Sequence, residues 1–478
     1  EFLDRHSAER RLIAQGSQEA LCVSEAFSGI RCSAHYYCGA LEAAWGLSGD
    51  DLLAEVQFAL PKQLQQPLTI EVHGTVCGDG SFYAEDAIAK GASLAIIKDS
   101  KVLNSSIQSS RVIAVKSPEK CLIESAKIAM ERYKGNIIGV TGSNGKTTTK
   151  NILNSCIKNS YATFQNYNNE IGLPLCALEL DSRNSTAIFE MGAAKLGDID
   201  LLSKIIKPNI GIITHIGHSH LDGLNSVKGV LEVKSELISN IKKDGAAIVP
   251  DSKYLNYWKK MRDDISFYTF GESPSASYFP SQIKMTKQGL SFFIESTHLK
   301  KRIPIKTKLV GMHNVLNILA SFAAIHAAKL HIEEFAASLQ DLVNPPQRLE
   351  LKTWAKQSQV IDDTYNANPD SMRAAIDVLS QCKGRKIAIL GDMAELGRYR
   401  KKLHIDLGDY AKIHGVDILL GYGDLMRHTA FAFGKNGFFF KSKIELIDFL
   451  KKNLAGKENI LLKGSRSMRM EEILDLWK

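Results

Sequence analysis

The sequence lacks any long apolar run, although 44% of its 478 residues are hydrophobic. No run approaches the about 20 consecutive apolar residues that a membrane-spanning helix requires, and we therefore expect no membrane span. Residues 1–11 contain several charges and neither an initiator methionine nor the apolar core of a signal peptide. The composition is otherwise typical of a globular protein with enough apolar material for buried cores.

Cysteines are sparse: there are eight, and no two of them form a CxxC pair. Pairs at that spacing are typical of zinc sites and redox motifs. Because the cysteines are few and scattered, we expect buried free thiols in a reducing compartment rather than disulfides. The sequence also has no internal repeats and no low-complexity segments.

A concentrated basic patch is also lacking, because the Lys and Arg residues behind the net charge of +8 are scattered along the chain. No RNA- or DNA-binding motif accompanies this charge, so we expect no nucleic-acid partner. A site that binds phosphates and carboxylates explains a mild basic excess equally well.

The most informative segment present is a glycine-containing turn with the sequence GVTGSNGKTTT, residues 139–149. It follows a short apolar run and precedes a helix-like segment at 150–157, which is the strand–turn–helix context of a phosphate-binding loop. Val140 stands where the general P-loop has its first glycine, so the chain has the shorter T-G-x-x-G-K-T form.

Each residue type in this turn suits a nucleotide phosphate. Gly142 and Gly145 let backbone N–H groups come close to phosphate oxygens, and the following helix start adds a positive dipole end. Lys146 can reach the β- and γ-phosphates, and the Thr147 hydroxyl can bind magnesium. The predicted nucleotide-binding residues of the turn are Gly142, Ser143, Asn144, Gly145, Lys146, Thr147 and Thr148.

Strand patterns alternate with helical patterns over most of the chain, which predicts an α/β protein of three domains. We expect a small N-terminal α/β domain at 1–133 and a central nucleotide-binding domain at 134–343, with a parallel sheet covered by helices on both faces. A linker with two prolines at 344–347 leads into a C-terminal Rossmann-like α/β domain at 344–478. Strands are predicted at 187–189, 210–214, 246–249, 360–361, 386–390, 418–420 and 460–462, and helices at 198–206, 227–241, 371–379, 402–413 and 444–450.

Polar side chains follow two of the central strands. Glu190 ends the run at 187–189, where a carboxylate can point into a ligand crevice and complete a magnesium site with Thr147. The alternative is a surface glutamate that closes a strand. His215, His218 and His220 follow the next strand, but no cysteine or second histidine group lies nearby to complete a zinc site. We expect one ligand histidine beside the phosphate site, with His215 and His218 structural or solvent-facing.

Other candidates lie on helices and loops. Lys234 is on an amphipathic helix and by its spacing alone reads as a solvated lysine. Asn314 opens a helix after Gly311, where an amide can cap the helix or contact an adenine. Asp363 lies in a dense polar run after a strand and suits a ribose hydroxyl. The segments 391–397 and 463–466 each follow a strand and suit an anionic, carboxylate-bearing substrate, the alternative being plain glycine-rich surface loops.

Taken in order, these motifs resemble the Mur ligase family from about Asp79 to the C-terminus. The residues that carry the resemblance are TGSNGKTTTK, NYNNEIGLP, FEMGA, SHLDG, VKSEL, GMHNVLN, DDTYNANPDSM, LGDMAELG and KGSRSMRME. YNANP and LGDM-x-ELG favour the family member that adds D-alanyl-D-alanine to UDP-muramoyl-tripeptide. The resemblance implies a cytoplasmic step of peptidoglycan synthesis that uses ATP and Mg²⁺ and proceeds through an acyl phosphate. We expect the enzyme to be a monomer.

The resemblance also implies roles for single residues. Catalytic roles fall on Lys146, His220, Lys234 and Arg348, and Lys234 matches the lysine that relatives carry as a carbamate. Thr147, Glu190, His220 and Lys234 would hold magnesium. Asn169, Asn314, Arg348 and Asp363 would contact the nucleotide. Tyr365, Asn366, Asn368, Asp392 and Glu395 would lie near the peptide or the acceptor dipeptide.

The chain departs from the family at its front. The D-S-R element and the P-G-D-L-F-V-A-L-like run that help relatives to hold the UDP-sugar are not found in the first region. Only residues 79–82 and 84–92 are similar to that domain. Three alternatives therefore stay open: a related Mur ligase with another acceptor, a folylpolyglutamate synthase, and an ATP-binding scaffold without catalysis.

Overall fold

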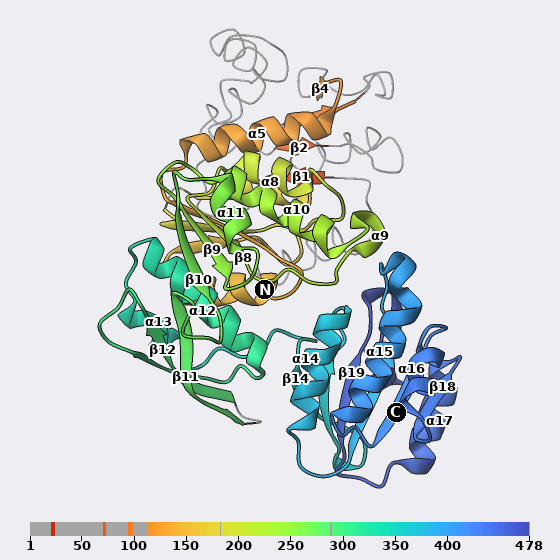
Figure 1. Ribbon diagram of the computed structural model, residues 1–478. Coiled ribbons are helices and arrows are strands. Elements are labelled where there is room, and N and C mark those ends of the chain that lie inside the picture. Colours follow the sequence, from red (N-terminus) through yellow and green to blue (C-terminus); the bar gives the residue numbers. More distant parts are fainter. Residues whose placement is uncertain are drawn as a thin grey trace, which may run out of the picture. The chain divides into compact units, whose positions relative to one another are not determined.

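The structure is a computed structural model that describes residues 21–23, 70–72, 94–98, 112–181, 183–286 and 289–477. The described chain forms two compact units: one takes in residues up to 135 with 163–184 and 204–207, and the other takes in the rest. Figure 1 shows the order of the helices and strands along the chain. The segments 79–82 and 84–92, on which the N-terminal resemblance rests, lie outside the described residues.

The first unit contains a four-stranded sheet in the order β1-β2-β3-β4. The strands are β1 (Leu21–Val23), β2 (Ile70–Val72), β3 (Leu94–Ile97) and β4 (Val112–Ala114). β2, β3 and β4 are parallel, whereas β1 is antiparallel to β2. Helix α5 (Pro118–Arg132) begins with a proline in its first turn and is capped by the Ser117 hydroxyl, which accepts the Lys120 N–H. The unit also includes α7 (Gly172–Leu178).

The second unit contains a nine-stranded sheet in the order β13-β12-β11-β10-β9-β8-β5-β7-β6. All neighbouring pairs from β6 to β11 are parallel, and only β12 runs antiparallel to its two neighbours. The strands are β5 (Asn136–Thr141), β6 (Ser160–Ala162), β7 (Thr186–Glu190), β8 (Ile210–Ile213), β9 (Ala246–Pro250), β10 (Ser266–Phe270), β11 (Tyr278–Thr286), β12 (Gly289–Ser296) and β13 (Ile303–Thr307).

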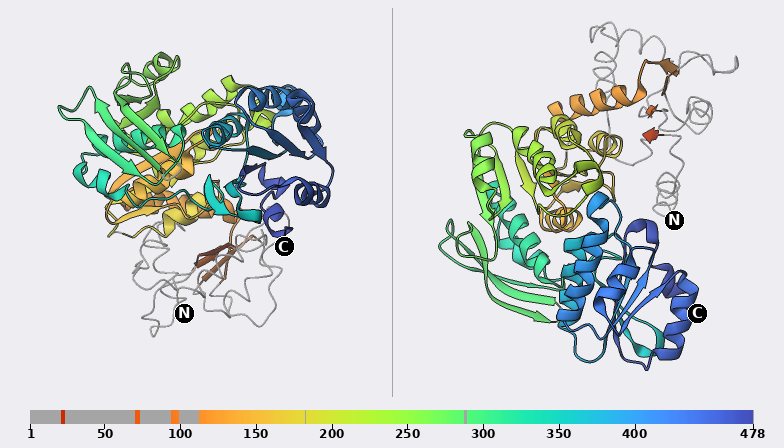
Figure 2. Two further views of the ribbon diagram at one scale, coloured as in Figure 1. Left: turned by 90° about the horizontal axis from the view of Figure 1, so that it is seen from below. Right: turned by 45° about the vertical axis from the view of Figure 1, so that its right-hand side comes forward.

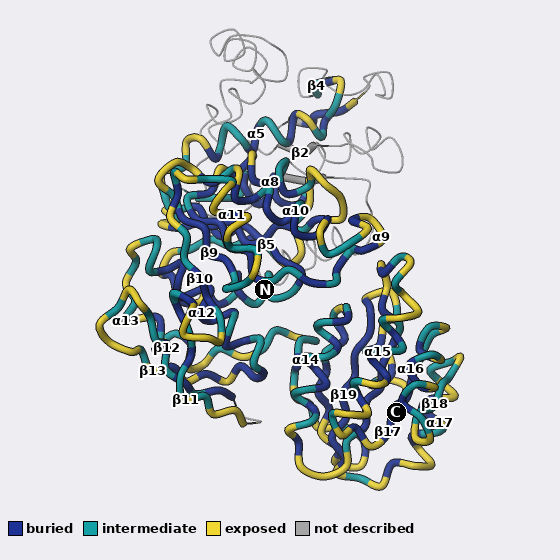
Figure 3. The backbone as a smooth tube through the Cα atoms, in the orientation of Figure 1, coloured by how far each residue is buried: buried dark blue, intermediate teal, exposed yellow. Residues whose placement is uncertain are grey.

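Helices cover both faces of this sheet. Ile210 and Ile212 of β8 pack in one core with residues of α6 and α12, while a side chain at Gly211 between them would meet Leu237 and Ile241 at α10. The central strands are accordingly buried along their whole length (Figure 3). The helices are α6 (Lys146–Cys156), α8 (Asp198–Ile206), α9 (Leu221–Leu224), α10 (Val227–Ser239), α11 (Leu255–Met261), α12 (Met312–Ala327) and α13 (Glu333–Ser338).

A six-stranded sheet follows in the order β14-β15-β19-β16-β17-β18, parallel except for β14. The last strand, β19, inserts between β15 and β16, so the loops after these three strands gather at one edge. Figure 2 shows this sheet with helices packed along it. The elements are β14 (Glu350–Thr353), η4 (Ala355–Gln357), β15 (Gln359–Asp363), α14 (Pro369–Ser380), β16 (Lys386–Gly391), η5 (Gly397–Tyr399), α15 (Arg400–Ile413), β17 (Ile418–Tyr422), α16 (Met426–Phe433), β18 (Gly437–Phe440), α17 (Lys443–Asn453), β19 (Asn459–Lys463), η6 (Arg466–Met468) and α18 (Glu472–Asp475).

The predicted α/β class and the predicted strands and helices are confirmed, with shifts of a few residues at their ends. The prediction that strands alternate with helices throughout the central region was wrong in one place. The four strands β10 to β13 follow one another with no helix between them. β12 lies antiparallel to β11 and β13 there, because short connections join these strands, whereas β10 and β11 pair parallel although no helix lies between them. The domain boundaries at 133/134 and 343/344 stay predictions.

Cys121 and Cys156 are buried free thiols, as expected from the sequence, and Cys176 and Cys382 are also buried. Within the described part of the chain, none of the helices has the length and apolar character needed to cross a bilayer.

A buried tryptophan fastens α11 to α10. The Trp258 side chain is fully buried, and its indole N–H donates to the Ser235 hydroxyl at 2.7 Å. Ser235 in turn donates to the Leu231 carbonyl within α10. This contact fixes the helix that carries Lys234.

We predict that Trp258→Ala destabilises the protein by about 3–5 kcal/mol, because it removes a large buried ring and leaves a cavity. The adjacent Tyr257 is 42% exposed, and Tyr257→Ala should change stability by no more than about 0.5 kcal/mol. Urea unfolding followed by circular dichroism measures both variants. Equal midpoints for the two would contradict the packing described here.

Candidate functional site

The turn between β5 and α6 has the geometry of a phosphate-binding loop. Gly142 and Gly145 have φ values of +149° and +83°, which side-chain-bearing residues rarely adopt. A Cβ at Gly142 would lie 2.0 Å from Thr214 Oγ1, and one at Gly145 would lie 2.3 Å from Asn317 Oδ1. Both glycines are therefore required by conformation and by space. The turn leaves the start of α6 with no side-chain cap, so its N–H groups are available to an anion.

The loop after β8 holds this turn in place. The Ser143 N–H donates to the His215 carbonyl at 2.8 Å, and the Ser143 hydroxyl accepts the Gly217 N–H at 3.1 Å. The Ser219 hydroxyl donates to Ser143 Oγ at 2.8 Å, and the Thr214 hydroxyl donates to the Asn144 carbonyl. The phosphate loop and the loop after β8, residues 214–221, which we call the histidine-containing loop, thus form one hydrogen-bonded structure.

Charged side chains gather below the phosphate loop. Lys146 Nζ donates to the Gly142 carbonyl at 2.9 Å. Lys150 Nζ lies 3.5 Å from Glu190 Oε2, and the side chains of Lys150 and Glu190 are both buried. Burial lowers the pKa of Lys146, while the charge of Glu190 opposes that shift. Glu190 is thus a buried carboxylate at the end of β7 and not a surface residue.

Lys234 on α10 is 1% exposed, which the amphipathic pattern did not indicate. Burial, and after it the positive charge of Lys146, lowers the pKa of Lys234 to about 7. Asp198, Glu236 and Glu190 act in the opposite direction. A lysine with this pKa is about half neutral at pH 7, and a neutral amine is a nucleophile.

The linker residue Arg348 reaches the phosphate loop. Its guanidinium donates from Nη2 to Thr147 Oγ1 at 3.2 Å and stacks on the ring of Tyr365, 4.0 Å from the ring centre. Such stacking holds an arginine in one orientation while leaving its N–H groups free to donate.

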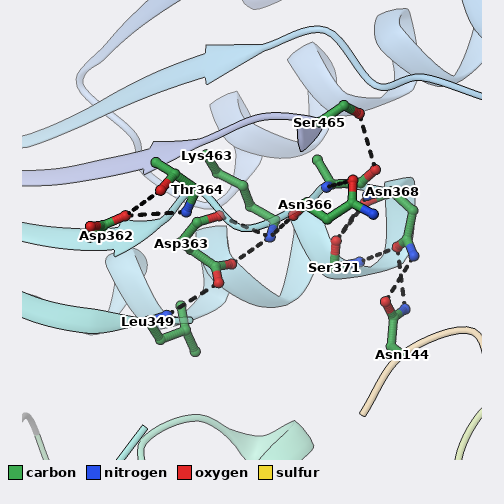
Figure 4. A network of polar contacts seen from close by, with 11 residues as sticks. Asn144, Leu349, Asp362, Asp363, Thr364, Asn366, Asn368, Ser371, Lys463 and Ser465 are labelled. Atoms are coloured by element: carbon green, nitrogen blue, oxygen red, sulfur yellow. Dashed lines mark hydrogen bonds and ion pairs between the residues drawn. The ribbon is translucent and has the colours of Figure 1, made fainter. Parts of the chain in front are cut away.

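Further contacts join the phosphate loop to residues after β15. The side-chain amides of Asn144 and Asn368 donate to each other at 2.8 and 3.2 Å (Figure 4). Asn368 also caps α14 in a capping box with Ser371. Asp363 accepts from Lys463 Nζ and, at 3.1 Å, from the Leu349 N–H.

The histidine-containing loop contacts the same region. His220 Nδ1 lies 2.6 Å from Glu395 Oε2, and this contact lowers the pKa of the Glu395 carboxyl. The His218 N–H donates to Asp370 Oδ2 at 2.8 Å. His215 and His218 are neither fully exposed nor fully buried, and burial lowers the pKa of His215.

The other predicted residues make local contacts. Asn314 Nδ2 donates to the Val310 carbonyl at 2.8 Å, and Asn366 Oδ1 accepts the Ala367 N–H. Asp392 accepts the N–H groups of Leu425 and Met426, and so organises the turn before α16. Thr148 lies in the first turn of α6. In the other compact unit, Asn169 Oδ1 accepts the Gly172 N–H at the start of α7.

The residues present fit a magnesium-bound nucleotide. Among the described residues, no group of three His, Cys, Asp or Glu side chains could hold a metal ion. Magnesium bound with a nucleotide does not need such a group, because phosphate oxygens and water supply most of its ligands. Thr147 and Glu190 offer oxygen ligands beside a turn whose glycines leave room for phosphate. An anion there also meets the positive charges of Lys146, Lys150 and Arg348.

Sequence reasoning missed Lys150 and Asp370. Lys150 is one helical turn after Lys146 and therefore on the same face of α6, which could have indicated it. Asp370 gave no local signal, because an acidic residue in the first turn of a helix is ordinary.

Known protein families match two parts of this chain. Residues 140–325 match the Mur ligase middle domain, and residues 347–466 match the Mur ligase, glutamate ligase domain. The UDP-N-acetylmuramoyl-tripeptide–D-alanyl-D-alanine ligase of Buchnera aphidicola subsp. Baizongia pistaciae is 33% identical over 403 residues, which cover 83% of this chain and 86% of that protein. The Bacillus subtilis enzyme of the same name is 33% identical over 410 residues and covers 83% and 87%.

Solved structures agree with these sequence matches. MurF from Acinetobacter baumannii superposes with a TM-score of 0.79 at 26% identity, covering 89% of this chain and 98% of that one. MurF from Thermotoga maritima, solved in complex with ADP, has a TM-score of 0.74 at 25% identity and covers 86% and 94%. The chain belongs to the Mur ligase family.

Proposed function

We propose that this protein is the ATP- and Mg²⁺-dependent ligase that joins D-alanyl-D-alanine to UDP-N-acetylmuramoyl-tripeptide in peptidoglycan synthesis. The relatives that match over most of the chain carry this name, and a similar structure holds ADP. The reaction belongs to the cytoplasm, where ATP and UDP-linked precursors are made, and we expect a monomer to perform it.

The observation that carries the proposal is the contact between the phosphate loop and the segment around β15. Thr147 with Arg348, and Asn144 with Asn368, bring two sets of motif residues to one place. A ligase of this kind must hold a nucleotide and a second substrate together, since most of its rate enhancement comes from positioning and charge stabilisation.

The first chemical step is a phosphoryl transfer. A carboxylate oxygen of the tripeptide forms a bond to the γ-phosphorus of ATP, and the bond from that phosphorus to the bridging oxygen of ADP breaks. Lys146 and the N–H groups of the phosphate loop stabilise the negative charge on the transferred group. Magnesium held by Thr147 and Glu190, with His220 at a second ion, would neutralise phosphate charge when bound.

The second step is an amide formation. The free amine of D-alanyl-D-alanine attacks the carbonyl carbon of the acyl phosphate, and a tetrahedral intermediate forms. The C–O bond to phosphate then breaks, and the amine gives up a proton. Asn366, Asn368, Tyr365, Asp392 and Glu395 are proposed to lie along the bound peptide or the dipeptide.

We predict phosphate release from ATP, Mg²⁺ and UDP-muramoyl-tripeptide only when D-alanyl-D-alanine is added, with formation of the pentapeptide product. Lys146→Ala should lower this rate by about a thousandfold, because it removes the cation that faces the phosphates. Mass spectrometry of the product, with single amino acids and glutamate as comparison acceptors, makes the measurement. Stimulation by glutamate instead would favour a folylpolyglutamate synthase, and nucleotide binding without any turnover would favour a scaffold.

A second prediction concerns Lys234, for which we propose the carbamate that the family resemblance implies. The neutral amine attacks the carbon of CO₂ and releases a proton, so the modification requires the unprotonated lysine. Because the pKa of Lys234 is about 7, carbamate occupancy should fall as the pH decreases from about 8 to about 6. Isotope-labelled bicarbonate followed by carbon NMR detects it without reference to activity.

The matched control for the carbamate is Lys234→Ala, which should show no labelled carbamate and very low activity that bicarbonate does not restore. Wild-type turnover in Lys234→Ala would contradict the assignment. A carbamate signal that persists in that variant would place the modification on another lysine.

A third prediction concerns Arg348. Arg348→Ala should raise the KM for ATP by about tenfold, because a charged hydrogen bond to Thr147 and a fixed positive charge are lost. Arg348→Lys should restore only part of the affinity, since an ammonium lacks the planar face that stacks on Tyr365 and the fixed fork of N–H donors. Steady-state kinetics with a thermal unfolding control checks this, and an unchanged KM in Arg348→Ala would remove the residue from the site.

A further inference from the structure

Asp370 contacts the histidine-containing loop although it lies in the first turn of α14. Its Oδ2 accepts the His218 N–H at 2.8 Å, and its Oδ1 lies 3.4 Å from His218 Nδ1. None of the steps proposed above uses this carboxylate. The contact joins the loop after β8 to the helix after β15, which are about 150 residues apart in the sequence.

An ordinary helix-capping role does not explain Asp370. An acidic residue at this position commonly stabilises the positive end of a helix dipole. Here the Asn368 side chain already accepts the Ser371 N–H, and the Ser371 hydroxyl completes a capping box. The Asp370 carboxylate instead points to a backbone N–H of another element, so its main partner is the loop.

Gly217 makes the close approach of this carboxylate possible. A Cβ at Gly217 would lie 2.2 Å from Asp370 Oδ2 and 2.3 Å from His215 Cε1. Its φ is outside the left-handed region, so a side chain is excluded here by space and not by backbone conformation. The Asp370 carboxylate can therefore reach the His218 N–H only because residue 217 is a glycine.

The loop that Asp370 holds carries two parts of the proposed site. Gly217 and Ser219 are hydrogen-bonded to Ser143 in the phosphate loop, and His220 follows directly. A displacement of the His218 backbone would move both Ser143 and His220. We propose that Asp370 is a positioning residue, which sets the phosphate loop and His220 by fixing the backbone of His218. The role of Asp370 in the site rests on the proposed function, whereas its contact with the His218 backbone rests on the structure alone.

The test compares Asp370→Ala with Asp377→Ala. Asp377 lies two turns later on α14 and accepts the Tyr410 hydroxyl at 2.6 Å, so its loss removes a carboxylate from the same helix without touching the loop. Asp370→Ala should weaken the binding of ADP with Mg²⁺ by about tenfold, because nucleotide binding must then order the loop that this charged hydrogen bond holds in the wild type. Asp377→Ala should leave that affinity unchanged.

Hydrogen exchange separates positioning from general destabilisation. The amides of residues 214–221 should exchange faster in Asp370→Ala than in the wild type or in Asp377→Ala, while amides elsewhere in the described chain exchange as in the wild type. Unchanged exchange together with unchanged ADP affinity overturns the proposal. A lowered thermal midpoint with uniformly faster exchange also overturns it, because Asp370 would then be a stability residue.

Two further variants make the assignment specific. Asp370→Asn keeps an oxygen acceptor for the His218 N–H and should restore most of the ADP affinity. Gly217→Ala should reproduce the defect of Asp370→Ala, and the double variant should be no worse than Gly217→Ala alone, since both changes break one contact. Two results would contradict the contact: losses of ADP affinity that multiply in the double variant, or an ADP affinity of Asp370→Asn as low as that of Asp370→Ala.

These measurements are independent of the ligase reaction. ADP affinity and amide exchange can be obtained even if D-alanyl-D-alanine does not stimulate phosphate release. If ligation is absent but Asp370→Ala changes ADP affinity and amide exchange as expected, only the proposed function is overturned. If ligation is normal but Asp370→Ala changes neither quantity, only this inference is overturned.

Discussion

The site depends on the close approach of two neighbouring residues, Thr214 and Asn317, to Gly142 and Gly145 of the phosphate loop. Thr214 and Asn317 occupy the space where side chains would stand, and both glycines have positive φ. Because no other residue fits these positions, β5, the loop after β8 and α12 are held at fixed distances from one another. The start of α6, which has no side-chain cap, follows directly after these glycines.

The side chains around this turn carry an excess of positive charge that suits an anionic ligand. Lys146, Lys150 and Arg348 lie around the same turn, and Glu190 is the buried carboxylate paired with Lys150. Buried cations raise the free energy of a protein unless opposite charge is near. Burial first, and then the neighbouring positive charges, lower the pKa of Lys146 and of Lys234. A nucleotide phosphate would complete the balance, and a carbamate at Lys234 would convert one cation into an anion.

The sequence predicted the parts of this structure that depend on short segments. The phosphate loop, the strands at 187–189 and 210–214 and the helix at 198–206 have local patterns, and the structure agrees with them. The strands β10 to β13 were not predicted, because strands without intervening helices give no strand–helix alternation to recognise. Which helix face is buried also depends on neighbours: Lys234 reads as a surface lysine until α10 is placed on the sheet.

Long-range contacts were the least predictable part of the site. The bond from Asp370 to the His218 backbone, the bond from Arg348 to Thr147 and the paired amides of Asn144 and Asn368 join residues far apart in the chain. Motif order suggested that these segments act together, but only the fold states which atoms meet. The roles assigned to individual site residues stay proposals that rest on this geometry.

The measurement that tests the account most directly follows the oxygen atoms of the tripeptide carboxylate. If that carboxylate is phosphorylated and the acyl phosphate is then attacked by the dipeptide amine, one carboxylate oxygen must leave with the phosphate. UDP-muramoyl-tripeptide labelled with heavy oxygen at its terminal carboxylate should therefore give inorganic phosphate with one labelled oxygen per product formed. Unlabelled phosphate alongside normal pentapeptide formation would contradict the acyl-phosphate mechanism on which the site has been interpreted.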